Sequence, residues 1–186
     1  GLPLMQALTL SEFRAVLAHE FGHYHGGDTR LGPWVYKTRA AIGRTLSSLS
    51  GSLLQKPFLW YGELFLRVSH AVSRRQEFSA DALASRVIGA RPLVSGLKKL
   101  QGTAMAYDAY WSQELQPVLQ AGFVAPIADG FRQFAGEKKI VEAMSEVLAR
   151  ELREGSTDPY DTHPALADRV AAVEGLSPGP DPVGEP

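Results

Sequence analysis

The sequence contains no cysteine among its 186 residues. Disulfide bonds and thiolate metal sites are therefore excluded, and a metal bound here must use nitrogen and oxygen ligands. The chain also lacks a charge excess, because 19 basic and 20 acidic residues give a formal net charge of −1. Nucleic-acid binding needs a basic footprint, so we expect no nucleic-acid partner.

Long apolar runs are missing as well. A membrane-spanning helix needs about 20 predominantly apolar residues, and the best candidate, residues 58–66, is short and contains Glu63. Residues 33–60 are also not expected to span a membrane, because they contain the basic residues Lys37, Arg39, Arg44 and Lys56. The aromatic residues in and next to this region suit either a membrane interface or ordinary packing; they are Trp34, Tyr36, Trp60 and Tyr61. We expect this chain to be soluble. Any membrane association of a longer protein would then run through segments outside it.

Helical periodicity dominates the remainder, and the one strand signal lies in residues 1–8. Thr9 and Glu12 form a capping-box pattern that predicts a helix from about residue 10 to 25, ending at Gly26. A second long helix is predicted over 59–88, and Pro164 suits the first turn of a last helix. Shorter helices are predicted between them, at 92–102, 104–120, 125–135 and 138–153. We therefore predict a mainly α domain over 1–175, and a disordered Pro/Gly-rich tail over 176–186.

The pattern that carries chemistry is His-Glu-Phe-Gly-His at residues 19–23. Residues four apart share one face of a helix, so His19 and His23 can chelate a single zinc ion. Glu20 lies next to that position, where it can take a proton from the attacking water and later pass it to the leaving amine. Because this short pattern also arises by chance, the interpretation needs a third ligand.

Two nearby positions fail as the third ligand. His25 lies two residues after His23, about 200° around the helix, and so points away from the other two histidines. The pattern that places a third histidine six residues after the second fails because that position is Thr29.

Glu77 and Asp81 on the second long helix are better candidates, because residues four apart share a face. Glu77 could complete a tetrahedral site that keeps one open position. Asp81 could accept the free ring N–H of a ligating histidine. The alternative is a solvated acidic face. His70, two turns before Glu77, could face the cleft, although packing is the commoner role for such a histidine.

Three segments of the chain carry a family resemblance: the pattern at residues 19–23, the sequence from Arg74 to Asp81, and Thr162-His163-Pro164 followed by Arg169. In these segments the chain resembles the M48 peptidases, which are gluzincins of the HtpX and CAAX-prenyl-protease type. The resemblance implies a zincin-like metallopeptidase domain with one zinc ion, bound by His19, His23 and Glu77. It makes Glu20 the general base and places Asp81 beside a zinc histidine. His163 or Arg169 would stabilise the oxyanion, and Tyr160 is a weaker candidate.

The resemblance implies a zinc-dependent endopeptidase that acts on peptide or protein substrates in protein quality control and is membrane-associated in its full-length form. Family members usually have substrate-holding strands before the histidine helix, and here only about ten residues precede it. The alternative is a non-catalytic helical module with a structural or regulatory zinc site. A fourth protein ligand, such as His25 or His163, would mark that alternative.

Overall fold

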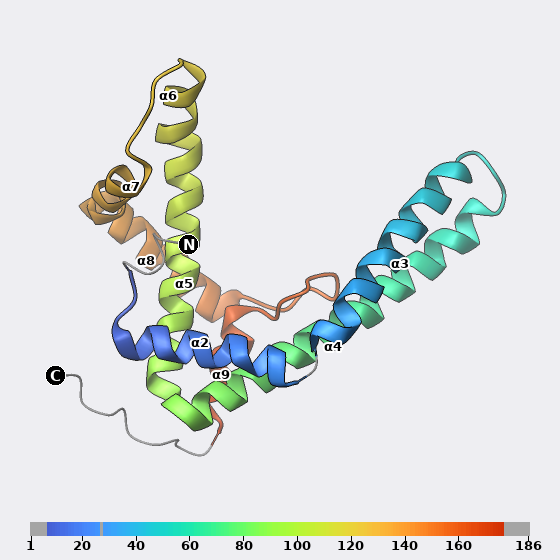
Figure 1. Ribbon diagram of the computed structural model, residues 1–186, viewed down its shortest axis with the longest axis horizontal. Coiled ribbons are helices and arrows are strands. Elements are labelled where there is room, and N and C mark those ends of the chain that lie inside the picture. Colours follow the sequence, from blue (N-terminus) through green and yellow to red (C-terminus); the bar gives the residue numbers. More distant parts are fainter. Residues whose placement is uncertain (1–6, 27, 177–186) are drawn as a thin grey trace.

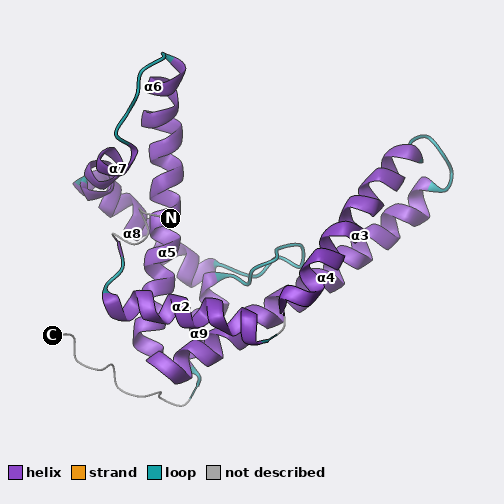
Figure 2. Cartoon of the chain, viewed as in Figure 1, coloured by secondary structure: helices purple, strands orange, loops and turns teal. Residues whose placement is uncertain are grey.

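The computed structural model describes residues 7–26 and 28–176, and all regular structure in these ranges is helical (Figure 2). The mainly α prediction is therefore confirmed for the described residues. The strand signal lies largely outside those ranges, as does nearly all of the predicted tail. The elements are α2 (Leu10–His25), α3 (Asp28–Ser48), α4 (Gln55–Ile88), α5 (Ala90–Tyr110), the π-helical turn η1 (Trp111–Leu115), α6 (Gln116–Gln120), α7 (Ile127–Gly136), α8 (Lys138–Glu154) and α9 (Leu166–Glu174).

Helix α2 begins as the sequence predicts. The Thr9 backbone N–H donates to Glu12 Oε2 at 2.8 Å, and the Glu12 N–H donates to Thr9 Oγ1 at 3.4 Å. The buried Glu12 also accepts hydrogen bonds from Ser95 Oγ at 2.6 Å and from Lys99 Nζ at 2.7 Å. Burial alone would raise the pKa of Glu12, but the bonds from Lys99, Ser95 and Thr9 lower it to about 2. The Glu12 carboxylate therefore links the start of α2 to α5 through these hydrogen bonds.

The face that α2 buries is not made of its large apolar side chains. The buried residues are Glu12, Ala15, His19 and Gly22, whereas the side chain of Phe21 is 67% exposed. Small residues are favoured because α2 packs very closely on α4. A Cβ added to Gly22 would lie only 2.8 Å from the Cα of Ala80. A large apolar side chain such as Phe21 is therefore left outside this contact.

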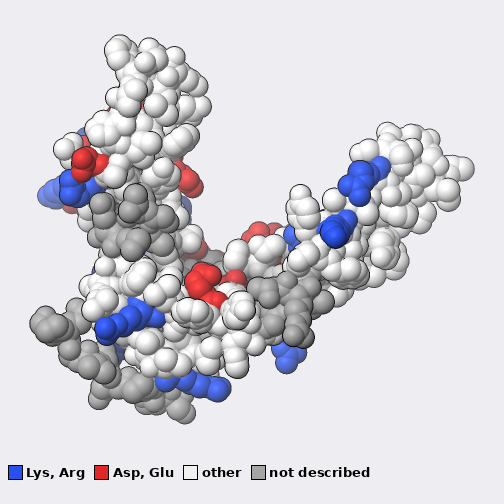
Figure 3. Space-filling view, in the orientation of Figure 1, with Lys and Arg blue, Asp and Glu red and all other residues white. Residues whose placement is uncertain are grey.

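Helices α3 and α4 form a long antiparallel hairpin, here called the arm, which projects from the rest of the molecule (Figure 1). Several of its aromatic side chains are largely exposed, among them Trp34 at 59% and Trp60 at 67%. Residues 33–62 contain basic residues and no acidic ones, and the charges visible on the outer arm in Figure 3 are accordingly those of Lys and Arg. No described helix is long and apolar enough to cross a membrane.

Two predicted boundaries needed correction. Helix α5 runs through Gly102 without the break predicted near residue 103, so the apparent boundary was an interior glycine. The last helix begins at Leu166 with Ala165 as its N-cap, which places Pro164 before the helix rather than in its first turn. Gly89 separates α4 from α5. Its backbone φ angle is 115°, a value that residues with a Cβ atom rarely adopt.

The buried apolar residues form two clusters. The first joins α2, α4, α5 and α9 and contains Ala15, Ala84, Leu93, Leu97 and Val170 among others. The second is aromatic, joins α5, η1 and α7, and contains Tyr110, Leu115, Phe131 and Phe134. The first cluster supports the helices that carry the candidate site residues.

Candidate metal centre

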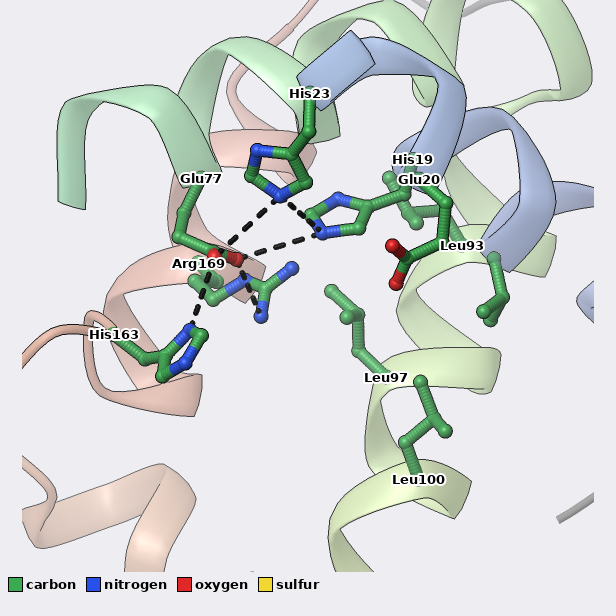
Figure 4. A pocket seen from close by; sticks show the side chains of 10 residues that line it. His19, Glu20, His23, Glu77, Leu93, Leu97, Leu100, His163 and Arg169 are labelled. Atoms are coloured by element: carbon green, nitrogen blue, oxygen red, sulfur yellow. Dashed lines mark hydrogen bonds and ion pairs between the residues drawn. The ribbon is translucent and has the colours of Figure 1, made fainter. Parts of the chain in front are cut away.

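His19, His23 and Glu77 meet where α2 crosses α4 (Figure 4). The Nε2 atoms of the two histidines are 3.1 Å apart. Glu77 Oε2 lies 3.5 Å from His19 Nε2, and Glu77 Oε1 lies 3.5 Å from His23 Nε2. Zinc with ligand bonds of about 2.0–2.1 Å in tetrahedral geometry would separate its ligands by roughly 3.3–3.4 Å. The three side chains therefore fit a divalent ion in both spacing and donor type.

Asp81 lies beside the first histidine. Its Oδ1 lies 2.9 Å from His19 Nδ1, so the opposite ring nitrogen faces His23 and Glu77. Burial lowers the pKa of His19, but the neighbouring Asp81 and Glu77 carboxylates outweigh this and raise it to about 9. This is the histidine–carboxylate pairing that fixes ring orientation at metal sites.

Arg169 on α9 joins the two carboxylates. Its Nε and Nη2 donate to the two Asp81 oxygens at 2.8 and 2.7 Å, and its Nη1 lies 3.3 Å from Glu77 Oε2. Burial raises the pKa of Asp81, but the bonds from Arg169 and His19 lower it overall. The guanidinium therefore makes a bidentate pair that holds α9 against α4.

His163 approaches from the segment between α8 and α9. Its Nδ1 lies 3.0 Å from Glu77 Oε1, and its side chain is 70% exposed. This segment is held by Arg74, whose Nη1 donates to the backbone oxygens of Pro159 at 2.9 Å and Asp161 at 2.7 Å. Arg74 belonged to the sequence motif, but its side-chain role was missed, because nothing in the sequence pairs it with carbonyl groups more than 80 residues away.

These residues surround a cavity of about 380 Å³. Glu20 is exposed and lines the cavity beside the three donors, and its carboxylate points into it (Figure 4). Leu93, Leu97 and Leu100 of α5 form an apolar wall of the same cavity. The arrangement thus places a carboxylate, a candidate metal site and an apolar surface around one solvent-accessible space.

The other histidines and Tyr160 lie outside this cavity lining. His25 is exposed at the end of α2, as its helical position predicts. His70 is buried, 7% exposed, and its pKa is lowered first by burial and then by Arg39. It therefore packs, as a buried neutral histidine does. Tyr160 is 48% exposed.

Comparison with known proteins shows which family the chain resembles over its length. The model of peptidase family M48 matches residues 2–177. An HtpX protease homologue of Gemmatimonas aurantiaca is 25% identical over 197 residues, covering 94% of this chain and 59% of the relative. Protease HtpX of Hahella chejuensis is 20% identical over 190 residues, covering 91% and 55%. A homologue from Neisseria meningitidis serogroup B is 29% identical over 116 residues, covering 53% and 42%.

The chain spans about half the length of the curated relatives it matches. No solved structure matches it significantly. The family match covers nearly the whole chain, including every helix that supplies a candidate site residue. The chain belongs to peptidase family M48.

Proposed function

We propose that this protein is a zinc-dependent endopeptidase that hydrolyses peptide bonds in peptide or protein substrates. The observation that carries the proposal is the spacing of 3.1 to 3.5 Å among the donor atoms of His19, His23 and Glu77. Two imidazoles and one carboxylate are a ligand set of catalytic zinc sites, which keep a further position open for the reaction.

A zinc ion held by these residues would supply Lewis-acid chemistry, acidifying water and polarising the scissile carbonyl. Glu20 would act as the general base: its carboxylate takes a proton from the attacking water and delivers it to the leaving amine. Two features support this role. Glu20 directly follows a proposed ligand in the helix, and it lines the same cavity. Asp81 would act indirectly, by holding the ring of His19 in its orientation.

Of the two oxyanion candidates, we propose His163 as the donor and Arg169 as a positioning residue. Three nitrogens of Arg169 already face Asp81 and Glu77, which leaves its guanidinium committed to the protein. His163 is exposed at the cavity and can turn toward a substrate. A donor aimed at the developing negative charge lowers the barrier by roughly 3–4 kcal/mol in favourable cases.

The rival proposal, a structural zinc site, would need a fourth protein ligand. Among the described residues the potential metal group consists of His19, His23 and Glu77. His25 lies outside the cavity lining, and His163 contacts Glu77 through Nδ1 from a largely exposed position. An open fourth position favours the catalytic proposal.

The test is Glu20→Gln. This substitution preserves shape and removes the base, so we expect about one bound zinc per chain and loss of peptide hydrolysis. Metal content is measured by elemental analysis, and activity with a quenched fluorescent peptide library. Glu77→Ala is the matched metal-site variant and should instead lose zinc. Full activity of Glu20→Gln in a preparation free of other proteases would refute the proposed base.

A further inference from the structure

A second cavity adjoins the candidate metal centre. It has a volume of about 790 Å³ and shares Leu97, Leu100, His163 and Arg169 with the first. Because these four side chains line both spaces, the two cavities are immediate neighbours, and the second lies between α5, α8, α9 and the segment that precedes α9. A peptide bound at the metal centre would therefore have room for a side chain in this second cavity, here called the side groove.

The side groove is lined by both apolar and polar side chains. Leu97, Leu100 and Ala104 of α5 line it together with Leu166 of α9. Glu151 of α8 and Gln101 of α5 also line it, and Gln101 Nε2 donates to Glu151 Oε2 at 3.3 Å. Since the Gln101 amide uses its N–H here, its carbonyl oxygen stays an acceptor. The side groove therefore presents acceptor atoms and a negative charge.

The charges around the side groove do not balance one another. Glu151 forms a hydrogen bond with Gln101, and no ion pair of Glu151 is found within the described part of the chain. Arg169 also lines the groove, but its charge is already paired with Asp81 and Glu77. Asp161 adds an exposed carboxylate at the rim, and Arg74 is bound to its backbone oxygen. Among the described residues that line the side groove, Glu151 is thus the half-buried carboxylate without an ion pair.

We propose that the side groove is a substrate subsite that takes a lysine or arginine side chain, and that Glu151 determines this specificity. The proposal rests on the proposed peptidase function. Its geometry is favourable, because Leu97 and Gln101 are one helical turn apart, about 6 Å along α5. The aliphatic stem of lysine or arginine can cover that apolar distance while its charged end reaches Glu151.

Other side chains would fit the side groove less well. A methionine or leucine would cover the apolar side chains but would leave the Glu151 carboxylate partly desolvated without a partner. A glutamate would meet the like charge of Glu151. A glutamine could donate hydrogen bonds but would not neutralise the charge. The expected order is therefore lysine or arginine, then glutamine, then methionine, and glutamate last.

The experiment uses the zinc-loaded chain and quenched fluorescent decapeptides of alternating glycine and alanine. Each peptide carries lysine, arginine, glutamine, methionine or glutamate at one position, and that position is moved along the peptide. At the position that enters the side groove, we expect kcat/KM for lysine or arginine to exceed that for methionine by about tenfold, the value of one charge-assisted hydrogen bond. Glu151→Gln should abolish most of this ratio, and Glu151→Lys should favour glutamate. Glu154→Gln, on the same helix and outside the groove lining, is the matched control and should keep the ratio.

Binding of the same peptides to zinc-loaded Glu20→Gln protein, measured by fluorescence anisotropy, separates the two proposals. Peptides that are bound with a Glu151-dependent preference for lysine but never cleaved by the unsubstituted chain would support the side groove and refute the peptidase. Cleavage with equal kcat/KM for lysine and methionine at every position would refute the side groove and leave the peptidase intact. A preference that survives Glu151→Gln would also refute it.

Discussion

Substitution of Gly22 tests whether the close contact between α2 and α4 sets the ligand spacing of the candidate metal centre. A Cβ at this position would lie 2.8 Å from the Cα and 3.0 Å from the Cβ of Ala80. Carbon atoms in favourable contact are at least ~3.5 Å apart, so Gly22→Ala would push α2 and α4 apart by roughly 0.7 Å. The obstacle is backbone of the facing helix, which cannot turn aside as a flexible side chain would.

Helix propensity and packing predict opposite signs for Gly22→Ala. Alanine is favoured over glycine inside a helix by about 1 kcal/mol, whereas overpacking a tight contact costs about 1–3 kcal/mol. Because the clash involves a backbone atom, we expect packing to dominate, with a net loss of about 1–2 kcal/mol. For a chain of this size that lowers Tm by roughly 2–8 °C.

The same separation should weaken metal binding. Gly22 adjoins His23, and Ala80 lies between Glu77 and Asp81, so the ligands from the two helices would move apart. Metal ligand distances tolerate only about 0.2 Å, and we expect zinc affinity to fall by about tenfold or more. Competition with a chromophoric chelator measures the affinity, and differential scanning calorimetry measures Tm.

Gly102→Ala is the matched control. Gly102 lies inside α5, and a Cβ there would meet no atom within 4 Å. It should raise stability by up to about 1 kcal/mol and leave zinc affinity unchanged. If Gly22→Ala behaved in the same way as this control, the close α2–α4 contact would not be what sets the ligand spacing.

Two further predictions concern charged groups of the core. The pKa of Glu12 is lowered from 4.5 to about 2, so its contribution to stability is present above pH 4.5 and lost as pH falls toward 2. That contribution is about 2–3 kcal/mol when Lys99, 41% exposed, is allowed some solvent screening. In urea unfolding, the stability difference between the unsubstituted chain and Glu12→Gln should therefore shrink from pH 7 to pH 3, and a constant difference would contradict it. Asp81→Asn removes the negative charge that pairs with His19 and Arg169. In the competition assay with a chromophoric chelator, it should weaken zinc binding by about 10–100-fold. Unchanged zinc affinity would show that other residues fix the orientation of His19.

Local sequence signals were enough to predict the parts of the site that lie on one helix. The Thr9–Glu12 capping box fixed the start of α2, and with it the helical register that puts His19 and His23 on one face. The spacing of Glu77 and Asp81 likewise placed both on one face of α4. Such inferences succeed because i and i+4 neighbours are set by helix geometry alone.

Contacts between helices were not predictable in this way. Nothing local in the sequence shows that Arg74 binds carbonyl groups of residues 159 and 161, or that Glu12 is buried against Ser95 and Lys99. The packing face of α2 could not be inferred from the size of its apolar side chains, because its buried residues are Glu12, Ala15, His19 and Gly22. Where two helices approach closely, small side chains are buried and a large one such as Phe21 stays outside.

The buried face of α2 shows how the fold and the candidate site depend on each other. On α2, Ala15 lies one turn before His19, and on α4, Ala84 lies two turns after Glu77; both alanines are fully buried in the first apolar cluster. Val170, next to Arg169, belongs to the same cluster. The cluster that joins α2, α4, α5 and α9 is therefore continuous with the metal centre. The second, aromatic cluster holds none of the candidate site residues or their immediate chain neighbours. A cavity made in the first cluster should disturb ligand spacing and stability together, whereas one in the second should reduce stability while leaving the ligand spacing intact.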